Sequence, residues 1–245
     1  MHRSFILLFA LLPLLFAQSS DSLVDRAVEL YLTRHQNFEN LFKSRDILEE
    51  VVNSEPGNVR ALYELSRVFY LLGDAAETKE EKLELYNKGK EYGEKAIKAD
   101  DDSAWAHFWY MVNLGRIGQT KGVLNSLALV PEIKKEIDRV LKLNPEHTGA
   151  FDARAMLYYE LPWLLGGNLN KSIEALNRGL EIDSNYTVLY IDMAKVYIKK
   201  KNYEKARWYL NKVLQITTPT YEADYVLIHK PEAKRLLKEI EEKEK

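Results

Sequence analysis

Histidines, cysteines and clustered carboxylates are the residue types that most often carry catalysis or bind metals. The chain has five histidines and no cysteine. The four histidines beyond the N-terminal segment do not have the short spacings of metal-binding motifs; they are His35, His107, His147 and His229. The sequence contains neither a phosphate-binding loop nor a nucleophile elbow. We therefore predict no catalytic residue, no metal, no cofactor and no enzymatic activity.

An acidic run, Asp100–Asp102, precedes Ser103 and offers the oxygen ligands that Ca²⁺ prefers. The same residues stand immediately before a predicted helix. Asp and Ser are favoured N-cap residues, and acidic side chains are stabilised near the positive end of a helix. We interpret the run as a helix cap, with Asp102 or Ser103 as the capping residue, rather than as a calcium site.

The densest aromatic cluster of the chain lies in a segment that is apolar on nearly every side, as a buried helix would be. Core packing is one interpretation, and the wall of an apolar binding cavity is the other. Asn113 and Arg116 favour the cavity, because polar groups in such surroundings need partners. The cluster consists of Trp105, His107, Phe108, Trp109, Tyr110 and Met111.

A second candidate site is the segment Leu161-Pro-Trp-Leu-Leu-Gly-Gly-Asn168. Proline and paired glycines are ordinary loop residues. Exposing Trp163, Leu164 and Leu165 to water, however, costs roughly 25 cal/mol per Å² of apolar surface. We expect these side chains to pack on the chain, on a partner or around a ligand.

Our hypothesis is that Trp163–Leu165 lies at the mouth of a cavity whose wall includes Trp105, Trp109 and Tyr158. The candidate ligand- or partner-binding residues are therefore Trp105, Trp109, Asn113, Arg116, Tyr158, Trp163, Leu164, Leu165, Gly166 and Gly167.

Almost every segment beyond residue 21 has apolar residues at helical spacing. A short extra helix is also considered for 121–130, and Pro131 and Pro231 suit the first turn of a helix. The helices are expected at 21–34, 38–54, 58–73, 79–99, 103–118, 131–143, 147–160, 169–182, 187–200, 203–216 and 231–243.

Five of these helices end in a similar pattern: an apolar pair, a polar residue, then a polar or proline stop. The patterns end at residues 56, 101, 145, 184 and 218, at intervals of 45, 44, 39 and 34 residues. The last interval equals the tetratricopeptide repeat (TPR) period. The sequence thus predicts an all-α, right-handed solenoid of TPR-like helical hairpins, with about four to five hairpins and about 10–12 helices.

The N-terminal residues resemble a secretory signal peptide. Met1–Arg3 is positively charged, Phe5–Phe16 is almost entirely apolar, and Ala17 suits the residue before a cleavage site. An uncleaved anchor is the alternative. We therefore expect a signal peptide at 1–17 and a single helical-repeat domain at 18–245. The net charge is −2, and the sequence lacks the basic stripe that phosphate binding requires, so nucleic acid is not an expected partner.

Several segments resemble a known family. In chain order they are Leu143-Asn-Pro145, His147-Thr-Gly-Ala150, Pro162, Leu165-Gly-Gly-Asn168 and a helix that ends Gly179-Leu-Glu-Ile. Together these segments are similar to the TPR-like T component of TRAP transporters. The resemblance extends from about Ala104 to Leu237. Many members of that family are lipoproteins, and this chain has no cysteine to acylate. Microtubule-dynamics regulators of the TPR class have a similar layout, but the predicted signal peptide argues against a cytoskeletal partner.

The resemblance implies a non-catalytic periplasmic or secreted accessory protein of solute transport. Its implied partners are the periplasmic solute-binding protein of a TRAP transporter and a hydrophobic small molecule. A second copy of the chain is a further candidate partner. The alternative function is a general TPR scaffold that holds an extended peptide in its groove, in the periplasm or cell envelope.

Overall fold

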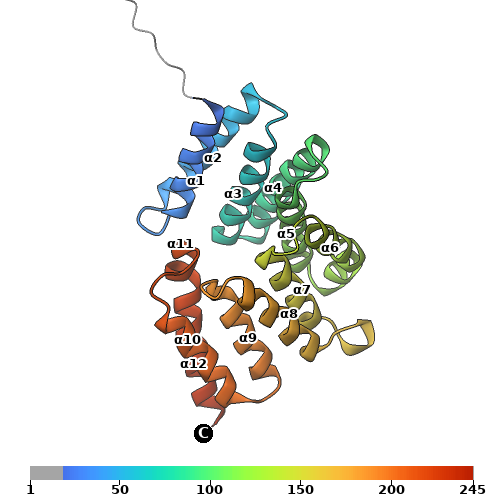
Figure 1. Ribbon diagram of the computed structural model, residues 1–245, viewed down its shortest axis with the longest axis vertical. Helices are drawn as coiled ribbons and strands as arrows, with labels where there is room; N and C mark the ends of the chain where they lie inside the picture. The colour runs from blue at the N-terminus through green and yellow to red at the C-terminus, as the bar shows by residue number, and fades with distance from the viewer. Residues whose placement is uncertain (1–18, 245) are drawn as a thin grey trace, which may run out of the picture.

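The computed structural model describes residues 19–244, and this part of the chain is a curved stack of helical hairpins without strands (Figure 1). The predicted all-α, TPR-like solenoid is confirmed. The main helices are α1 (Ser20–Leu32), α2 (Glu39–Ser54), α3 (Val59–Ala75), α4 (Lys79–Ala99), α5 (Ala104–Lys121), α6 (Val123–Leu143), α7 (Thr148–Glu160), α8 (Leu169–Ile182), α9 (Thr187–Lys199), α10 (Tyr203–Gln215) and α12 (Lys230–Lys243). Short elements are the 3₁₀ turn η1 (Trp163–Leu165), α11 (Glu222–Asp224) and the π-helical turn η2 (Tyr225–His229).

Helix starts follow the capping residues in the sequence. Ser103 caps α5, its hydroxyl accepting a hydrogen bond from the Ala106 N–H, which confirms the capping interpretation of the acidic run. Thr78 and Glu81 form a reciprocal capping box at the start of α4. Pro231 lies in the first turn of α12 as predicted.

The start of α6 differs from the prediction. We expected a helix from Pro131, but α6 begins at Val123 and contains Pro131 in its interior. Gly122, with φ of 106°, lets the chain turn directly out of α5. The early turns of α6 then pack against α5, where a Cβ added to Gly118 would lie 3.0 Å from Leu129 Cδ1. This packing holds the segment helical across a proline that would otherwise mark a boundary.

Glycines set the close approach of α4 to α5. A Cβ at Gly93 would lie 2.7 Å from the Tyr110 Cα, and one at Gly89 would lie 2.3 Å from Asn113 Oδ1. Asn113 is fully buried there and donates from Nδ2 to the backbone carbonyls of Ser66 (3.1 Å) and Trp109 (2.9 Å). A polar junction thus joins α3, α4 and α5 at the centre of the stack.

The curvature of the stack brings its two ends together. Arg34, just after α1, forms an ion pair with Asp224 of α11, 190 residues away in sequence. The Arg67 guanidinium of α3 lies 4.8 Å from the centroid of the Tyr221 ring, just before α11. Figure 1 shows α11 lying beside the end of the first hairpin. These contacts enclose the concave face of the solenoid.

The signal peptide predicted at 1–17 lies outside the described residues. Within residues 19–244, no helix combines the length and the apolar character needed to cross a bilayer.

Candidate functional site

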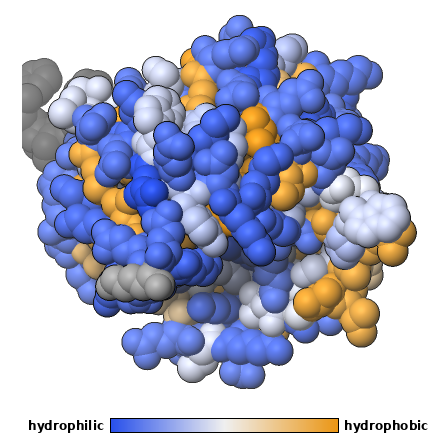
Figure 2. Space-filling view, turned by 90° about the horizontal axis from the view of Figure 1, so that it is seen from below, coloured by the Kyte–Doolittle hydropathy of each residue, from blue (hydrophilic) through white to orange (hydrophobic). Residues whose placement is uncertain are grey.

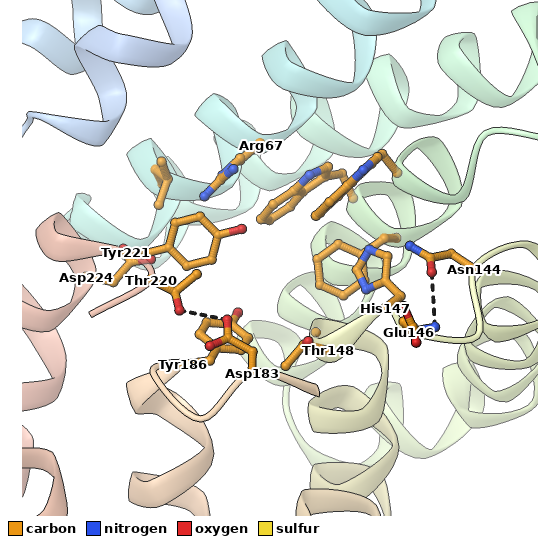
Figure 3. A pocket seen from close by; sticks show the side chains of 15 residues that line it. Arg67, Asn144, Glu146, His147, Thr148, Asp183, Tyr186, Thr220, Tyr221 and Asp224 are labelled. Atoms are coloured by element: carbon orange, nitrogen blue, oxygen red, sulfur yellow. Dashed lines mark hydrogen bonds between the residues drawn. The ribbon is translucent and has the colours of Figure 1, made fainter. Parts of the chain in front are cut away.

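A pocket of about 220 Å³ lies on the concave face (Figure 3). Its walls come from segments far apart in sequence: α3, α5, the α6–α7 and α8–α9 loops with the helix starts that follow them, and the chain around α11. The lining residues are Arg67, Leu71, Trp105, Phe108, Trp109, Asn144, Glu146, His147, Thr148, Gly149, Asp183, Tyr186, Thr220, Tyr221 and Asp224.

The aromatic wall belongs to α5. Trp105, Phe108 and Trp109 share one face because residues three and four apart are neighbours on a helix. The Phe108 ring lies 6.0 Å from the Trp105 ring and 5.0 Å from the Trp109 ring, both edge to face. Trp109 is buried, whereas 37% of Trp105 is exposed. Part of the cluster is therefore core, and Trp105 keeps a ring surface open to a ligand.

Arg67 places a buried positive charge among aromatic rings. Its guanidinium carbon lies 4.5 Å from the Tyr31 ring centroid, 5.0 Å from Trp109 and 4.8 Å from Tyr221. Arg67 Nη1 donates to the Tyr31 hydroxyl (2.9 Å), which in turn donates to Glu64 (2.9 Å). Burial raises the pKa of Glu64, and the charge of Arg67 partly offsets this shift. The guanidinium is thus held in a fixed position by stacking and hydrogen bonding.

His147 both caps α7 and lines the pocket. Its Nδ1 accepts the backbone N–H of Ala150 at 3.2 Å, so the ring proton of the neutral form lies on Nε2. Nε2 is buried and has no hydrogen-bond partner. Burial lowers the pKa of His147 to about 4, so the ring is neutral at physiological pH.

Two carboxylates of the pocket have no cationic partner within residues 19–244. Asp183 accepts hydrogen bonds from the Thr220 hydroxyl (2.7 Å) and the Asn185 N–H (2.9 Å), and Glu146 is exposed and forms no ion pair. Figure 3 shows Asp183 beside Tyr186 and Glu146 beside His147, with Arg67 at the opposite side of the pocket. The third carboxylate, Asp224, is neutralised by Arg34.

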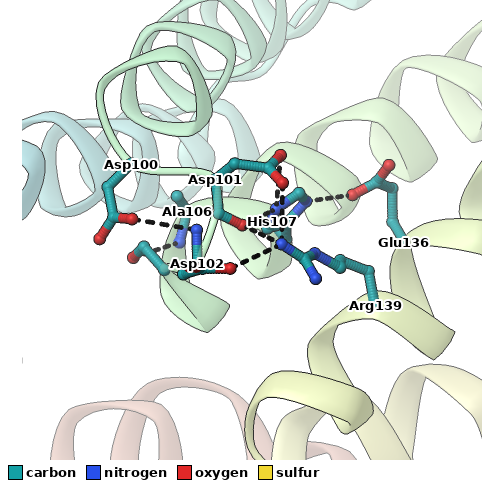
Figure 4. Close-up of polar contacts among 8 residues, drawn as sticks. Asp100, Asp101, Asp102, Ala106, His107, Glu136 and Arg139 are labelled. Carbon is teal, nitrogen blue, oxygen red and sulfur yellow. Dashed lines mark hydrogen bonds and ion pairs between the residues drawn. The ribbon is translucent and has the colours of Figure 1, made fainter.

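The acidic run at 100–102 has a structural role (Figure 4). Arg139 donates to Asp101 (2.8 Å) and Asp102 (2.9 Å), which ties the α4–α5 loop to α6. Buried His107 bridges the same two elements through Glu136 (2.6 Å) and the Asp101 carbonyl (2.9 Å). Within the described residues, no group of three or more His, Asp or Glu side chains is arranged to hold a metal ion.

The structure divides the predicted site residues. Trp105 and Trp109 line the pocket. Asn113 belongs instead to the buried junction described above. Arg116 pairs with Asp74 (3.0 Å) and bonds the Tyr70 hydroxyl (3.2 Å). Tyr158 is half-buried and lies 5.7 Å from Lys171 Nζ, outside the pocket. Neither Tyr158 nor residues 163–167 line this pocket.

The tip formed by Trp163–Leu165 is the most exposed large apolar group of the α7–α8 hairpin. The exposed fractions are 80% for Trp163, 73% for Leu164 and 50% for Leu165. The loop protrudes beside α7 and α8 in Figure 1, and Figure 2 shows hydrophobic side chains gathered at the same edge of a mostly hydrophilic surface. Burial against the chain, one of the expectations for these side chains, does not occur.

The pocket residues that sequence reasoning missed follow a simple pattern. His147, Tyr186 and Tyr221 each come two or three residues after a helix-end pattern, those ending at 145, 184 and 218. These three helix ends lead the chain to the pocket, so the residues just beyond them line it. Arg67 lies in the middle of a helix, and no pattern in the neighbouring sequence indicates that it lines the pocket.

The fold is that of a TPR-like helical solenoid whose concave face carries a pocket. The family model described as regulator of microtubule dynamics protein 1-3 matches residues 23–164, more than half of the chain. This chain therefore belongs to that family. A tetratricopeptide repeat model matches residues 188–218, in agreement with the predicted repeat.

Individual relatives agree with the family assignment. Regulator of microtubule dynamics protein 1 of Bos taurus is 24% identical over 182 residues, covering 68% of this chain and 56% of the relative. The same protein of Pongo abelii is 24% identical over 230 residues, covering 87% of this chain and 71% of the relative. The chain thus spans little more than half the length of the bovine protein.

Solved structures share the fold alone. A thermophilic TPR protein of Thermus thermophilus superposes with a TM-score of 0.67 at 16% identity, covering 89% of this chain and 100% of that one. PilW, a type IV pilus biogenesis factor, superposes with a TM-score of 0.59 at 18% identity, covering 93% and 92%.

The resemblance to the T component of TRAP transporters was wrong, because the family model and the relatives are regulators of microtubule dynamics. The transport role and the solute-binding-protein partner, both implied by that resemblance, are wrong for the same reason. The periplasmic or secreted location, which was also inferred from the predicted signal peptide, is wrong on the same family evidence. The misleading motif has a local explanation. A Cβ at Gly167 would lie 1.8 Å from the Leu161 carbonyl oxygen, Gly166 has φ of 97°, and Asn168 caps α8. Pro…Leu-Gly-Gly-Asn thus meets the steric needs of this loop.

Proposed function

We propose that this chain is a non-catalytic scaffold that acts in the regulation of microtubule dynamics by holding a segment of a partner protein in its concave pocket. The family assignment supports a role in the regulation of microtubule dynamics. The pocket supports the binding of a partner segment. The observation that carries the proposal is the pocket itself, whose lining comes from segments between α3 and α11 and leaves the Trp105 ring accessible. TPR-like solenoids commonly use such concave surfaces for binding.

We also propose that residues 18–245 act as one domain. The ion pair between Arg34 and Asp224 supports this, because it joins the first hairpin to α11, which precedes the final helix α12. A partner segment seated between them would contact both ends and stabilise the closed arrangement by mass action.

The test measures microtubule growth and catastrophe rates by fluorescence microscopy in an animal-cell extract supplemented with the purified chain. We expect the wild-type chain to change these rates and Trp105→Ala to lose most of the effect. Trp208→Ala is the matched control, since Trp208 is 53% exposed and lies outside the pocket. A wild-type chain without effect on either rate contradicts the proposed process, and equal effects of the two variants contradict the role of the pocket.

We further propose that the Trp163–Leu165 tip is a second contact with a partner, because exposed apolar clusters often mark interaction sites. Trp163→Ala should change the free energy of unfolding by no more than about 0.5 kcal/mol, as for other exposed positions. A buried tryptophan would cost about 3–5 kcal/mol instead. Urea denaturation measures this difference. The same variant should recover less partner in pull-downs from the extract, and unchanged recovery would leave the tip as an ordinary loop.

A further inference from the structure

The pocket holds charges and hydrogen-bonding groups that its own residues leave unmatched. Three buried side-chain nitrogens in its lining have no hydrogen-bond partner: Arg67 Nε, Trp109 Nε1 and His147 Nε2. All three are N–H donors in the states argued above. Leaving a buried donor without an acceptor is unfavourable. All three donors belong to residues that line one cavity, and a ligand with acceptor oxygens there would satisfy them.

The charges of the lining indicate a second property of the ligand, a positive charge. Within the part of the chain that the structure describes, Glu146 and Asp183 form no ion pair, and Asp224 is paired with Arg34, which lies outside the lining. Arg67 is the one cation of the lining, and it is already stacked between Tyr31, Trp109 and Tyr221. The carboxylates of Glu146 and Asp183 therefore remain available to a positive charge from outside the chain.

Each of these two carboxylates lies beside a ring of the lining, Asp183 beside Tyr186 and Glu146 beside His147 (Figure 3). Tyr186 comes three residues after Asp183 in the sequence. The ring of His147, the residue after Glu146, lies 4.4 Å from the Trp105 ring. A carboxylate beside an aromatic face is suited to a guanidinium or ammonium group, which gains both an ion pair and a cation–π contact.

We propose that the pocket receives an extended partner segment that carries a lysine or arginine side chain. The basic side chain lies between Glu146 and Asp183 against the Trp105 and Tyr186 rings, and the backbone carbonyl oxygens of the segment accept hydrogen bonds from the three unmatched donors. This proposal rests on the peptide-binding function proposed above and adds the chemistry of the bound residue.

An acidic segment is the main competitor, because a carboxylate would also accept from the three donors and pair with Arg67. It would, however, bring a like charge close to Glu146 and Asp183, which disfavours binding. A neutral carbonyl oxygen matches the donors without this repulsion. The balance of charges in the lining thus favours the basic segment.

The experiment uses three probe peptides of the form acetyl-Gly-Ser-X-Ser-Gly-amide, in which X is arginine, citrulline or glutamate. Citrulline has the shape of arginine without its charge. Binding to the full ¹⁵N-labelled chain is followed through the indole N–H signals of its four tryptophans. We expect the arginine peptide to shift the Trp105 and Trp109 signals and to bind at least about tenfold more tightly than the citrulline peptide, with the glutamate peptide weakest.

The double variant Glu146→Gln/Asp183→Asn should reduce the affinity for the arginine peptide to that for citrulline. Both substitutions keep the side-chain shape and an acceptor oxygen, and retained indole signals report that the pocket is folded. Glu174→Gln is the control, an exposed carboxylate outside the pocket.

Preferred binding of the glutamate peptide, equal binding of arginine and citrulline, or an unaffected double variant would overturn the proposal, as would the absence of any shift with the arginine peptide. The proposed function is judged separately. If citrulline or glutamate peptides shift the pocket indoles, peptide binding stands and only the preference for a basic residue fails. If no peptide binds, the microtubule measurements with Trp105→Ala still decide the role of the pocket.

Discussion

Replacing Arg67 with methionine is expected to lower the free energy of unfolding by about 3–5 kcal/mol. Arg67 is buried and donates a hydrogen bond to the Tyr31 hydroxyl, which donates to buried Glu64. The positive charge of Arg67 balances the negative charge of Glu64. Methionine fills a similar length but removes the positive charge, so Glu64 must either remain charged in an apolar setting or take up a proton. Urea denaturation at neutral pH measures the loss.

The physical origin of this loss can be separated by two further variants. In Arg67→Met/Glu64→Gln the unmatched carboxylate is also removed, so part of the stability should return. Arg60→Met is the matched control on the same helix, because Arg60 pairs with Asp25 at the surface and should contribute no more than about 1 kcal/mol. Arg67→Met should also regain stability as the pH falls, since Glu64 then becomes neutral. A loss equal to that of Arg60→Met would contradict the proposed buried network.

Acidification from pH 7 to pH 4 should cost about 3 kcal/mol through His147 alone. Burial lowers the pKa of His147 from 6.5 in the unfolded chain to about 4 in the folded one. The folded state therefore favours the neutral ring. Its contribution to stability is fully present above pH 6.5 and is lost as the pH falls toward 4. Protonation would also place a hydrogen on Nδ1, which now accepts from the Ala150 N–H.

The measurement is the free energy of unfolding from urea titrations at several pH values between 7 and 4. His147→Asn is the appropriate comparison, because asparagine is a favourable N-cap residue and does not titrate in this range. The variant should show a flatter dependence on pH. Burial also lowers the pKa of His229, but that residue is present in both proteins and its effect cancels in the difference. Parallel curves for the two proteins would exclude His147 as the source.

The mistaken resemblance to the T component of TRAP transporters shows that a short local pattern can be explained by backbone geometry rather than by family. The segment from Pro162 to Asn168 was recognised as a signature, but its residue types are required by a left-handed φ at Gly166, a steric limit at Gly167 and a cap at Asn168. Another TPR-like hairpin with this loop would need the same residues. Motifs that satisfy backbone geometry therefore carry less information about family than matches over half of a chain.

The sequence by itself determined the helical hairpins, the TPR-like repeat and a helix cap at Asp102 or Ser103, because these depend on spacing within one or two helices. It also left Trp105 and Trp109 with two interpretations, core packing or a cavity wall, because their helix is too apolar to be a surface element. Only the tertiary structure decided that the two ends of the solenoid meet through Arg34 and Asp224. That contact joins residues 190 positions apart, and it depends on the small rotation accumulated at every hairpin, which no local pattern encodes. The same accumulated curvature places Arg67, Asp183 and Tyr221 around one pocket. The structure also shows that the Trp163–Leu165 tip, in the turn between α7 and α8, stays in solvent.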